Sequence, residues 1–164
     1  MKPKLYVETT VVGYLTTRVS RDVVTAAHQK ITQQWWEQRR ESFELYTSEI
    51  VVDEAGAGDR VQAEKRRSYL AGLQVLVWSP EALELAKLLL KRKALPPKAS
   101  DDAGHLAIAA VAGMDYLLTW NYRHLVNASL RPLMQQVCKK AGFRCPLICT
   151  PQELLEGAPW RTRS

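Results

Sequence analysis

Short apolar runs alternate with longer amphipathic stretches along almost the whole chain, and this alternation constrains the fold most. The apolar runs are expected to be strands, at residues 4–8, 43–47, 75–78, 116–119 and 147–149. Helices are expected at 22–41, 48–56, 59–71, from Ser79 to before Pro96, from Ser100 onward, and at 129–141. Parallel strands need long crossover connections, which are usually helices and cover both faces of the sheet. The sequence therefore predicts an α/β fold, a three-layer α/β/α sandwich with a central, mostly parallel sheet of four to five strands.

The length and composition are those of one globular unit. A chain of 164 residues with 46% hydrophobic residues can bury a substantial core. We expect a single domain over residues 1–156 and a flexible tail at 157–164. No apolar run approaches the roughly 20 residues of a membrane span. The first residues also lack the apolar stretch of a secretory signal, so we expect a cytoplasmic protein without a membrane partner.

The chain is basic, with a formal net charge of +6. The basic residues gather in short clusters, at 39–40, 65–67, 91–93 and 139–140. Such a balance favours a polyanionic partner, because basic side chains that neutralise phosphates release counterions. Solvated helix faces would explain the individual clusters as well, and both interpretations stay open.

Acidic and amide side chains nevertheless follow the apolar strands of this basic chain. Glu8 ends the first strand, Asp102 stands at the start of an alanine-rich helix, and Asn121 comes shortly after the strand at 116–119. In open α/β sheets, ligands bind beyond the carboxyl ends of the strands. Carboxylate oxygens are also what hard divalent cations such as Mg²⁺ bind. The spacing therefore predicts a carboxylate-lined site for such a cation.

Four segments together resemble a PIN-domain ribonuclease, specifically the VapC-type toxin of a type II toxin–antitoxin system. The resemblance covers roughly residues 4–155 and is carried by Glu8-Thr9-Thr10, by Ser48 to Glu54, by Asp101 to Ala107 and by Thr119 to His124. It implies a PIN-like sandwich with strand order 3-2-1-4-5 and a cofactor of Mg²⁺ or Mn²⁺. It further implies a metal-dependent endoribonuclease that cleaves single-stranded regions of RNA. The partners it implies are a cognate antitoxin protein and a second copy in a homodimer.

The resemblance also assigns residue roles. The implied catalytic residues and metal ligands are Glu8, Glu54, Asp102 and Asn121. Glu49 and Asp53 are the alternatives to Glu54, since they lie on the same predicted helix. Thr9, Thr10 and Asp101 are expected to support the site, and Arg18, Arg21 and Arg123 flank it in the sequence as candidate RNA contacts. A bound cation would activate a water and offset charge on the phosphate in an in-line displacement.

Two departures from the family pattern keep a second function open. Glu8 replaces the usual Asp and carries its carboxylate further out, while Asn121 replaces a frequent Asp with a neutral amide. The alternative is a catalytically weakened PIN-fold domain that binds RNA or protein. A receiver-like phosphoacceptor is disfavoured, because the strand ends offer Thr47, Trp78 and Thr119 instead of an acceptor Asp.

Histidines and tryptophans receive plainer interpretations. His105 lies three residues after Asp102 and faces the same side of the helix, but a hydrogen-bonded structural role is favoured. His28 and His124 are expected at the surface. Trp35 and Trp36 are interpreted as core or dimer contacts, in preference to RNA-stacking residues.

Overall fold

Five parallel strands form the centre of the fold. The structure is a computed structural model that describes residues 1–156; the tail predicted at 157–164 lies outside the described residues. The strands are β1 (Lys4–Val7), β2 (Glu44–Ser48), β3 (Gln74–Leu76), β4 (Tyr116–Leu118) and β5 (Leu147–Cys149). They lie in the order β3-β2-β1-β4-β5, and every neighbouring pair is parallel. The predicted sheet is confirmed, and its order is the one that the resemblance implies.

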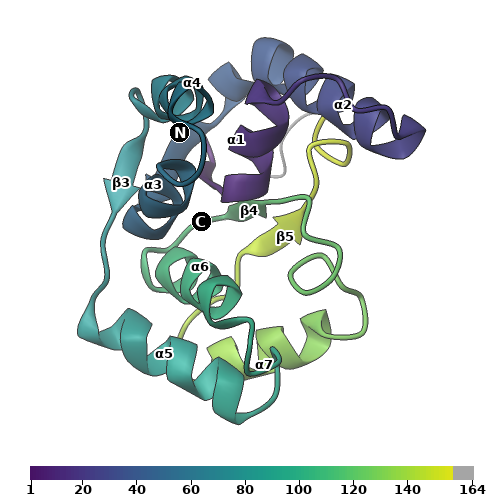
Figure 1. The fold of residues 1–164 in the computed structure, drawn as a ribbon. Helices are drawn as coiled ribbons and strands as arrows, with labels where there is room; N and C mark the ends of the chain where they lie inside the picture. Colours follow the sequence, from purple (N-terminus) through teal and green to yellow (C-terminus); the bar gives the residue numbers. More distant parts are fainter. Residues whose placement is uncertain (157–164) are drawn as a thin grey trace.

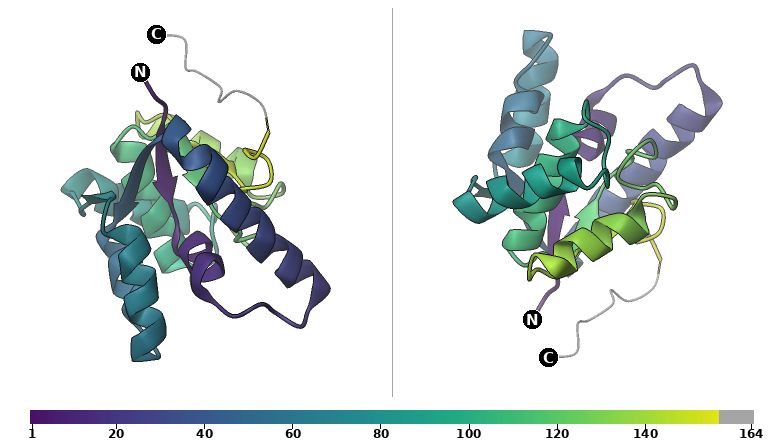
Figure 2. Two further views of the ribbon diagram at one scale, coloured as in Figure 1. Left: turned by 90° about the horizontal axis from the view of Figure 1, so that it is seen from above. Right: turned by 90° about the horizontal axis from the view of Figure 1, so that it is seen from below.

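Helices cover the sheet on both sides. They are α1 (Thr9–Thr16), α2 (Val23–Arg39), α3 (Glu49–Ala55), α4 (Arg60–Leu70), α5 (Pro80–Lys91), α6 (Ser100–Val111) and α7 (Arg131–Lys140), with a 3-10 turn η1 (Arg40–Ser42) after α2. In Figure 1, α1, α2 and α4 lie above the sheet and α5, α6 and α7 below it. Figure 2 shows the same layers from above and below. Within residues 1–156, no helix combines the length and apolar character needed to cross a bilayer.

The central strand β1 is enclosed by these layers. Leu5, Tyr6 and Val7 have no exposed surface, because β2 and β4 flank β1 and helices cover both faces. A strand buried on both faces reads as a continuous apolar run, as the sequence indicates. Burial of β1 fixes the position of Glu8, the residue that follows it.

Helix α1 was not among the predicted elements. Its sequence, TTVVGYLT, is rich in β-branched residues, which have low helix propensity. Tertiary packing overrides that preference, because Val11, Val12 and Leu15 are buried in the core. The side chain of Glu8 also accepts a hydrogen bond from the backbone of Thr10 and so caps the first turn.

Helix α6 begins differently from the expectation. Ser100 was expected to cap it from outside, but Ser100 is its first helical residue and no side chain caps the N-terminus. Asp101 and Asp102 stand in the first turn, where a carboxylate offsets the positive end of the helix dipole.

Small residues let α6 approach its neighbours closely. A methyl group built on Gly104 would lie 2.6 Å from Cδ1 of Ile50 and 3.0 Å from the ring of Trp78. Gly104 therefore lets α6 pack against α3 and against the segment that follows β3. That packing sets the distance between Asp102 on α6 and Glu54 on α3.

We expect Gly104→Ala to lower the free energy of unfolding by about 1–3 kcal/mol, because overpacking forces neighbouring side chains to shift. Gly13→Ala is the matched control. The space around Gly13 is open, and it lies in the interior of α1, so alanine there is expected to stabilise by about 0.5–1 kcal/mol. Chemical denaturation followed by circular dichroism measures both. Equal effects of the two substitutions would contradict the close packing of α6.

Candidate functional site

The candidate site lies where β1 and β4 end. These strands are parallel neighbours, so Glu8 after β1 and Thr119 after β4 stand side by side at the carboxyl edge of the sheet. The hydroxyl of Thr119 donates to Oε1 of Glu8 at 2.7 Å. The backbone N–H of Glu8 in turn donates to the carbonyl of Leu118 at 3.1 Å. The strand pairing thus sets the position of the first acid.

The carboxylate of Glu8 is held almost entirely by the protein. The residue is only 3% exposed. Besides Thr119, Thr10 donates to it twice, from its backbone N–H to Oε2 at 2.9 Å and from its hydroxyl to Oε1 at 2.7 Å. The longer side chain of Glu, compared with Asp, folds back over the first turn of α1. Thr10 thus holds Glu8 in place, and its supporting role at a functional site stays a prediction.

Glu54 is the acid that α3 turns toward the site. Its Oε1 accepts from the hydroxyl of Thr9 at 3.0 Å and lies 2.8 Å from Nε2 of His105. The two alternative acids on α3 are placed elsewhere. Asp53 is exposed, and Oε1 of Glu49 accepts from the backbone of Trp78. The side chain of Glu54 is 34% exposed, so it is the most accessible of the three acids at the site.

His105 connects Glu54 to the core. It is a buried residue of α6, and its Nδ1 lies 2.6 Å from the hydroxyl of Tyr6, which lies 2.6 Å from the hydroxyl of Ser48. A carboxylate only accepts hydrogen bonds, so Nε2 of His105 donates to Glu54 in either protonation state. The two hydroxyls can reverse their direction, which gives Nδ1 a partner whether or not it carries a proton.

The pKa values of this buried pair are shifted. Burial lowers the pKa of His105, but the hydrogen bond to Glu54 and the charges of Glu8, Glu54 and Asp102 outweigh it and raise the pKa above its ordinary value. Burial raises the pKa of Glu54, but His105 and the hydrogen bond from Thr9 lower it by more. The pKa of Glu54 therefore lies below its usual range. Both shifts favour a carboxylate paired with an imidazolium. Burial also raises the pKa of Tyr6, which keeps its proton.

Asp102 is held by two residues that follow β4. Its Oδ1 accepts from Nδ2 of Asn121 at 3.0 Å, and its Oδ2 lies 2.8 Å from Nδ1 of His124. Its side chain is 17% exposed. His124 was expected at the surface, but its side chain is only 16% exposed and it contacts an acid of the site. That expectation was wrong, because the loop after β4 folds back over the first turn of α6.

The amide of Asn121 has a defined orientation. Its oxygen accepts from the backbone N–H of His124 at 3.0 Å, and its nitrogen donates to Asp102. A backbone donor on one side and a carboxylate on the other allow only this assignment. In this arrangement Asn121 presents a donor to the acids, and its role as a metal ligand stays a prediction.

The structure brings together most of the predicted site residues. Thr9, the residue after Glu8, donates to Glu54, and His105, three residues after Asp102 on α6, contacts Glu54. These contacts place the three acids in one region, and their charges raise the pKa of His105. Asp101, by contrast, is exposed and makes no side-chain hydrogen bond to a described residue. The three predicted RNA contacts, Arg18, Arg21 and Arg123, are exposed, and their side chains pair with no acid among residues 1–156.

The donor set suits a hard cation in its chemistry, since it consists of carboxylate and hydroxyl oxygens. The arrangement is not that of a formed metal site. Among residues 1–156, no three His, Cys, Asp or Glu side chains are grouped so as to hold a metal ion. Protein donors already occupy both oxygens of Glu8 and of Asp102. Hydrogen bonds therefore offset these charges in the structure.

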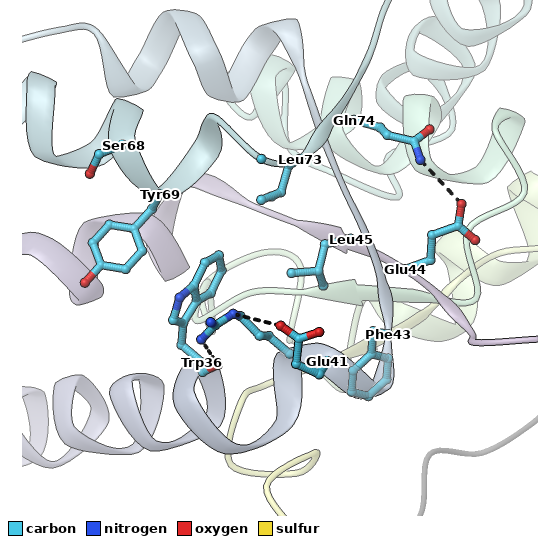
Figure 3. Close-up of a pocket in the computed structure, with 11 residues that line it drawn as sticks. Trp36, Glu41, Phe43, Glu44, Leu45, Ser68, Tyr69, Leu73 and Gln74 are labelled. Carbon is cyan, nitrogen blue, oxygen red and sulfur yellow. Dashed lines mark hydrogen bonds and ion pairs between the residues drawn. The ribbon is translucent and has the colours of Figure 1, made fainter.

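A hollow of about 620 Å³ lies at the opposite edge of the sheet (Figure 3). It is lined by Glu44 and Gln74, which begin β2 and β3, and by the rings of Trp36 and Tyr69. These two rings meet edge to face with centroids 5.3 Å apart. Because strands β2 and β3 begin there and the acids lie where β1 and β4 end, the hollow is separate from the candidate site.

We expect Tyr6→Phe to lower the free energy of unfolding by about 1–3 kcal/mol, because buried His105 and Ser48 both lose a partner. Tyr46→Phe is the control, since its hydroxyl contacts only the half-buried Glu44, and we expect a loss below about 1 kcal/mol. Urea denaturation compares the two variants. An equal loss would contradict the role given to the buried hydrogen bonds that link Ser48 through Tyr6 and His105 to Glu54.

No protein-family model matches the chain, and no curated protein does. Among solved structures, the chain resembles one in VapBC2 from Rickettsia felis bound to a DNA fragment from their promoter. The TM-score is 0.58 at 13% identity, over 90% of this chain and 98% of that chain. It also resembles a chain of VapBC-1 from nontypeable Haemophilus influenzae, with a TM-score of 0.56 at 14% identity, over 91% of this chain and 98% of that chain. These likenesses show the fold, which is the PIN-like α/β fold that the sequence predicts.

Proposed function

We propose that this chain is a metal-dependent endoribonuclease that cleaves single-stranded regions of RNA and acts as the toxin of a toxin–antitoxin pair. The observation that carries the proposal is the place of Glu8 at the carboxyl end of β1, with Glu54 bonded to the neighbouring Thr9 and to His105, which lies three residues after Asp102. Paired carboxylates at such an edge are suited to a divalent cation and to phosphate chemistry. The fold shared with chains of VapBC structures supports the same assignment.

The proposed cofactor is Mg²⁺ or Mn²⁺, which when bound lowers the pKa of a water and offsets charge on the phosphate oxygens. Glu54 and Asp102 would hold it most directly, since their side chains are the more exposed ones. Glu8 and Asn121 complete the proposed set. Thr9 and His105 orient Glu54, while Thr10 and Thr119 orient Glu8. Each acid is thus positioned before a substrate arrives.

The proposed partners are RNA, a cognate antitoxin protein and a second copy of the chain, all in the cytoplasm. The net charge of +6 favours a phosphate backbone, and the exposed Arg18, Arg21 and Arg123 are proposed to contact it. The likeness to chains of two VapBC structures supports a protein partner.

A second candidate function is a catalytically weakened PIN-fold domain that binds RNA or protein. One observation favours it: the oxygens of Glu8 and Asp102 are already used by protein donors. Asn121 adds a donor and removes a negative charge where the family often has Asp. Both features would lower the affinity for a cation.

We expect Asp102→Asn to reduce Mn²⁺-dependent cleavage of single-stranded RNA by about a hundredfold or more, since even outer-shell changes at metal sites cost 10- to 100-fold. Asp53→Asn is the matched control, because it removes the same charge from an exposed position on α3 and should leave the rate unchanged. The measurement is gel-resolved cleavage of a labelled RNA, with and without EDTA.

The outcomes separate the two functions. Cleavage that persists in Asp102→Asn would point to a contaminating nuclease. RNA binding by the wild-type chain without any cleavage would favour the weakened binding domain.

A further inference from the structure

Four aromatic rings gather beside the acids, and we call them the aromatic cluster: Tyr14, His28, Trp120 and Tyr122. They come from α1, α2 and the segment after β4. His28 stacks on Trp120 with centroids 4.1 Å apart and planes 15° apart. Tyr122 lies 5.9 Å from His28 and 6.2 Å from Trp120, and Tyr14 lies 6.1 Å from Trp120. His28, expected to be a surface residue, is therefore half-buried as part of this cluster.

The inner part of the cluster is fixed. Trp120 is only 4% exposed, and its Nε1 donates to the hydroxyl of Thr32 at 2.7 Å, inside α2. Tyr122 is the outer ring and is 50% exposed. An aromatic side chain that is half in water and backed by a stacked pair presents a firm apolar surface to a ligand.

The cluster is joined to the acids by hydrogen bonds. The backbone N–H of Trp120 donates to the hydroxyl of Thr10, which itself donates to Glu8. Asn121, between the two aromatic residues, donates to Asp102. Tyr122 therefore directly follows the residue that contacts Asp102. Arg123, the next residue, is exposed and adds a positive charge there.

We propose that the aromatic cluster is a nucleobase-stacking subsite, in which the exposed ring of Tyr122 holds one base of a single-stranded RNA beside the acids. The inference rests on the proposed function and names how that site would take its substrate. Every base offers a π-face, so aromatic stacking suits single strands, whose bases are not paired. The basic character of the chain complements the backbone of such a strand. In a paired duplex the bases are stacked on each other, so the subsite selects unpaired segments.

The test compares two RNA probes of about twelve nucleotides and equal charge, an oligo(A) strand and a strand whose central nucleotides are abasic. Binding to the full wild-type chain is measured by fluorescence anisotropy in EDTA, which prevents metal-dependent cleavage. We expect oligo(A) to bind at least about fivefold more tightly than the abasic strand. Tyr122→Leu should abolish that ratio, and Tyr122→Phe, which keeps the ring, should preserve it.

Tyr69→Leu provides the matched control, because it makes the same change in the hollow at the other edge of the sheet and should preserve the ratio. Equal binding of the two strands by the wild-type chain would overturn the proposal without any variant. A ratio that survives in Tyr122→Leu would overturn it as well, and would leave the ring as a contact for a protein partner. The assay needs no cleavage, so its outcome is independent of the proposed nuclease activity. A chain that stacks bases but never cuts RNA would contradict the proposed nuclease and still support this subsite.

Discussion

Three carboxylates that gather at one edge of a sheet repel each other, and the local structure has to offset that repulsion. Like charges in a partly buried site raise each other's proton affinity unless a counter-charge or hydrogen-bond donors are present. Here His105 contacts Glu54, and the charges of Glu8, Glu54 and Asp102 raise its pKa. Hydroxyl, amide and imidazole groups contact both oxygens of Glu8 and of Asp102, while Glu54 accepts through its Oε1. The acids can therefore lie close together.

The same residues link this site to the core. Tyr6 lies in the middle of β1, packs with no exposed surface, and contacts His105 and Ser48. Glu8 lies two residues after Tyr6, directly after the end of β1 and at the site. Side chains positioned by a packed strand are held more precisely than those on a loop, so an acid placed at the end of β1 has little freedom. Stability and positioning thus depend on one strand.

Much of the fold follows from local pattern. The apolar runs predict all five strands, and the acid that ends the first strand, Glu8, together with the acid that opens an alanine-rich helix, Asp102, leads to the site. Helix α1 escapes prediction because packing, not propensity, forms it. Where the sequence offered three acids on α3, only the contacts of Glu54 with Thr9 and His105 distinguish it.

What the sequence could not predict involves contacts across long separations. Tyr6 and His105 are 99 positions apart, and periodicity carries no signal for such a pair. The favoured structural interpretation of His105 agrees with its burial and hydrogen bonds, while its contribution to a functional site stays a prediction. Asn121 accepts from the backbone N–H of His124 three residues on, and such short-range bonds of Asn side chains are the local signal that the sequence does offer for a turn at this point.

The central claim is that these acids form a cation site, and anomalous diffraction from crystals grown with Mn²⁺ tests it most directly. The account predicts a strong anomalous peak between the carboxylates of Glu54 and Asp102, with Glu8 behind them. A structure from crystals at saturating Mn²⁺ would contradict the claim if it showed no anomalous peak at these acids. In that structure the hydrogen bonds of Asp102 to Asn121 and His124 would remain intact.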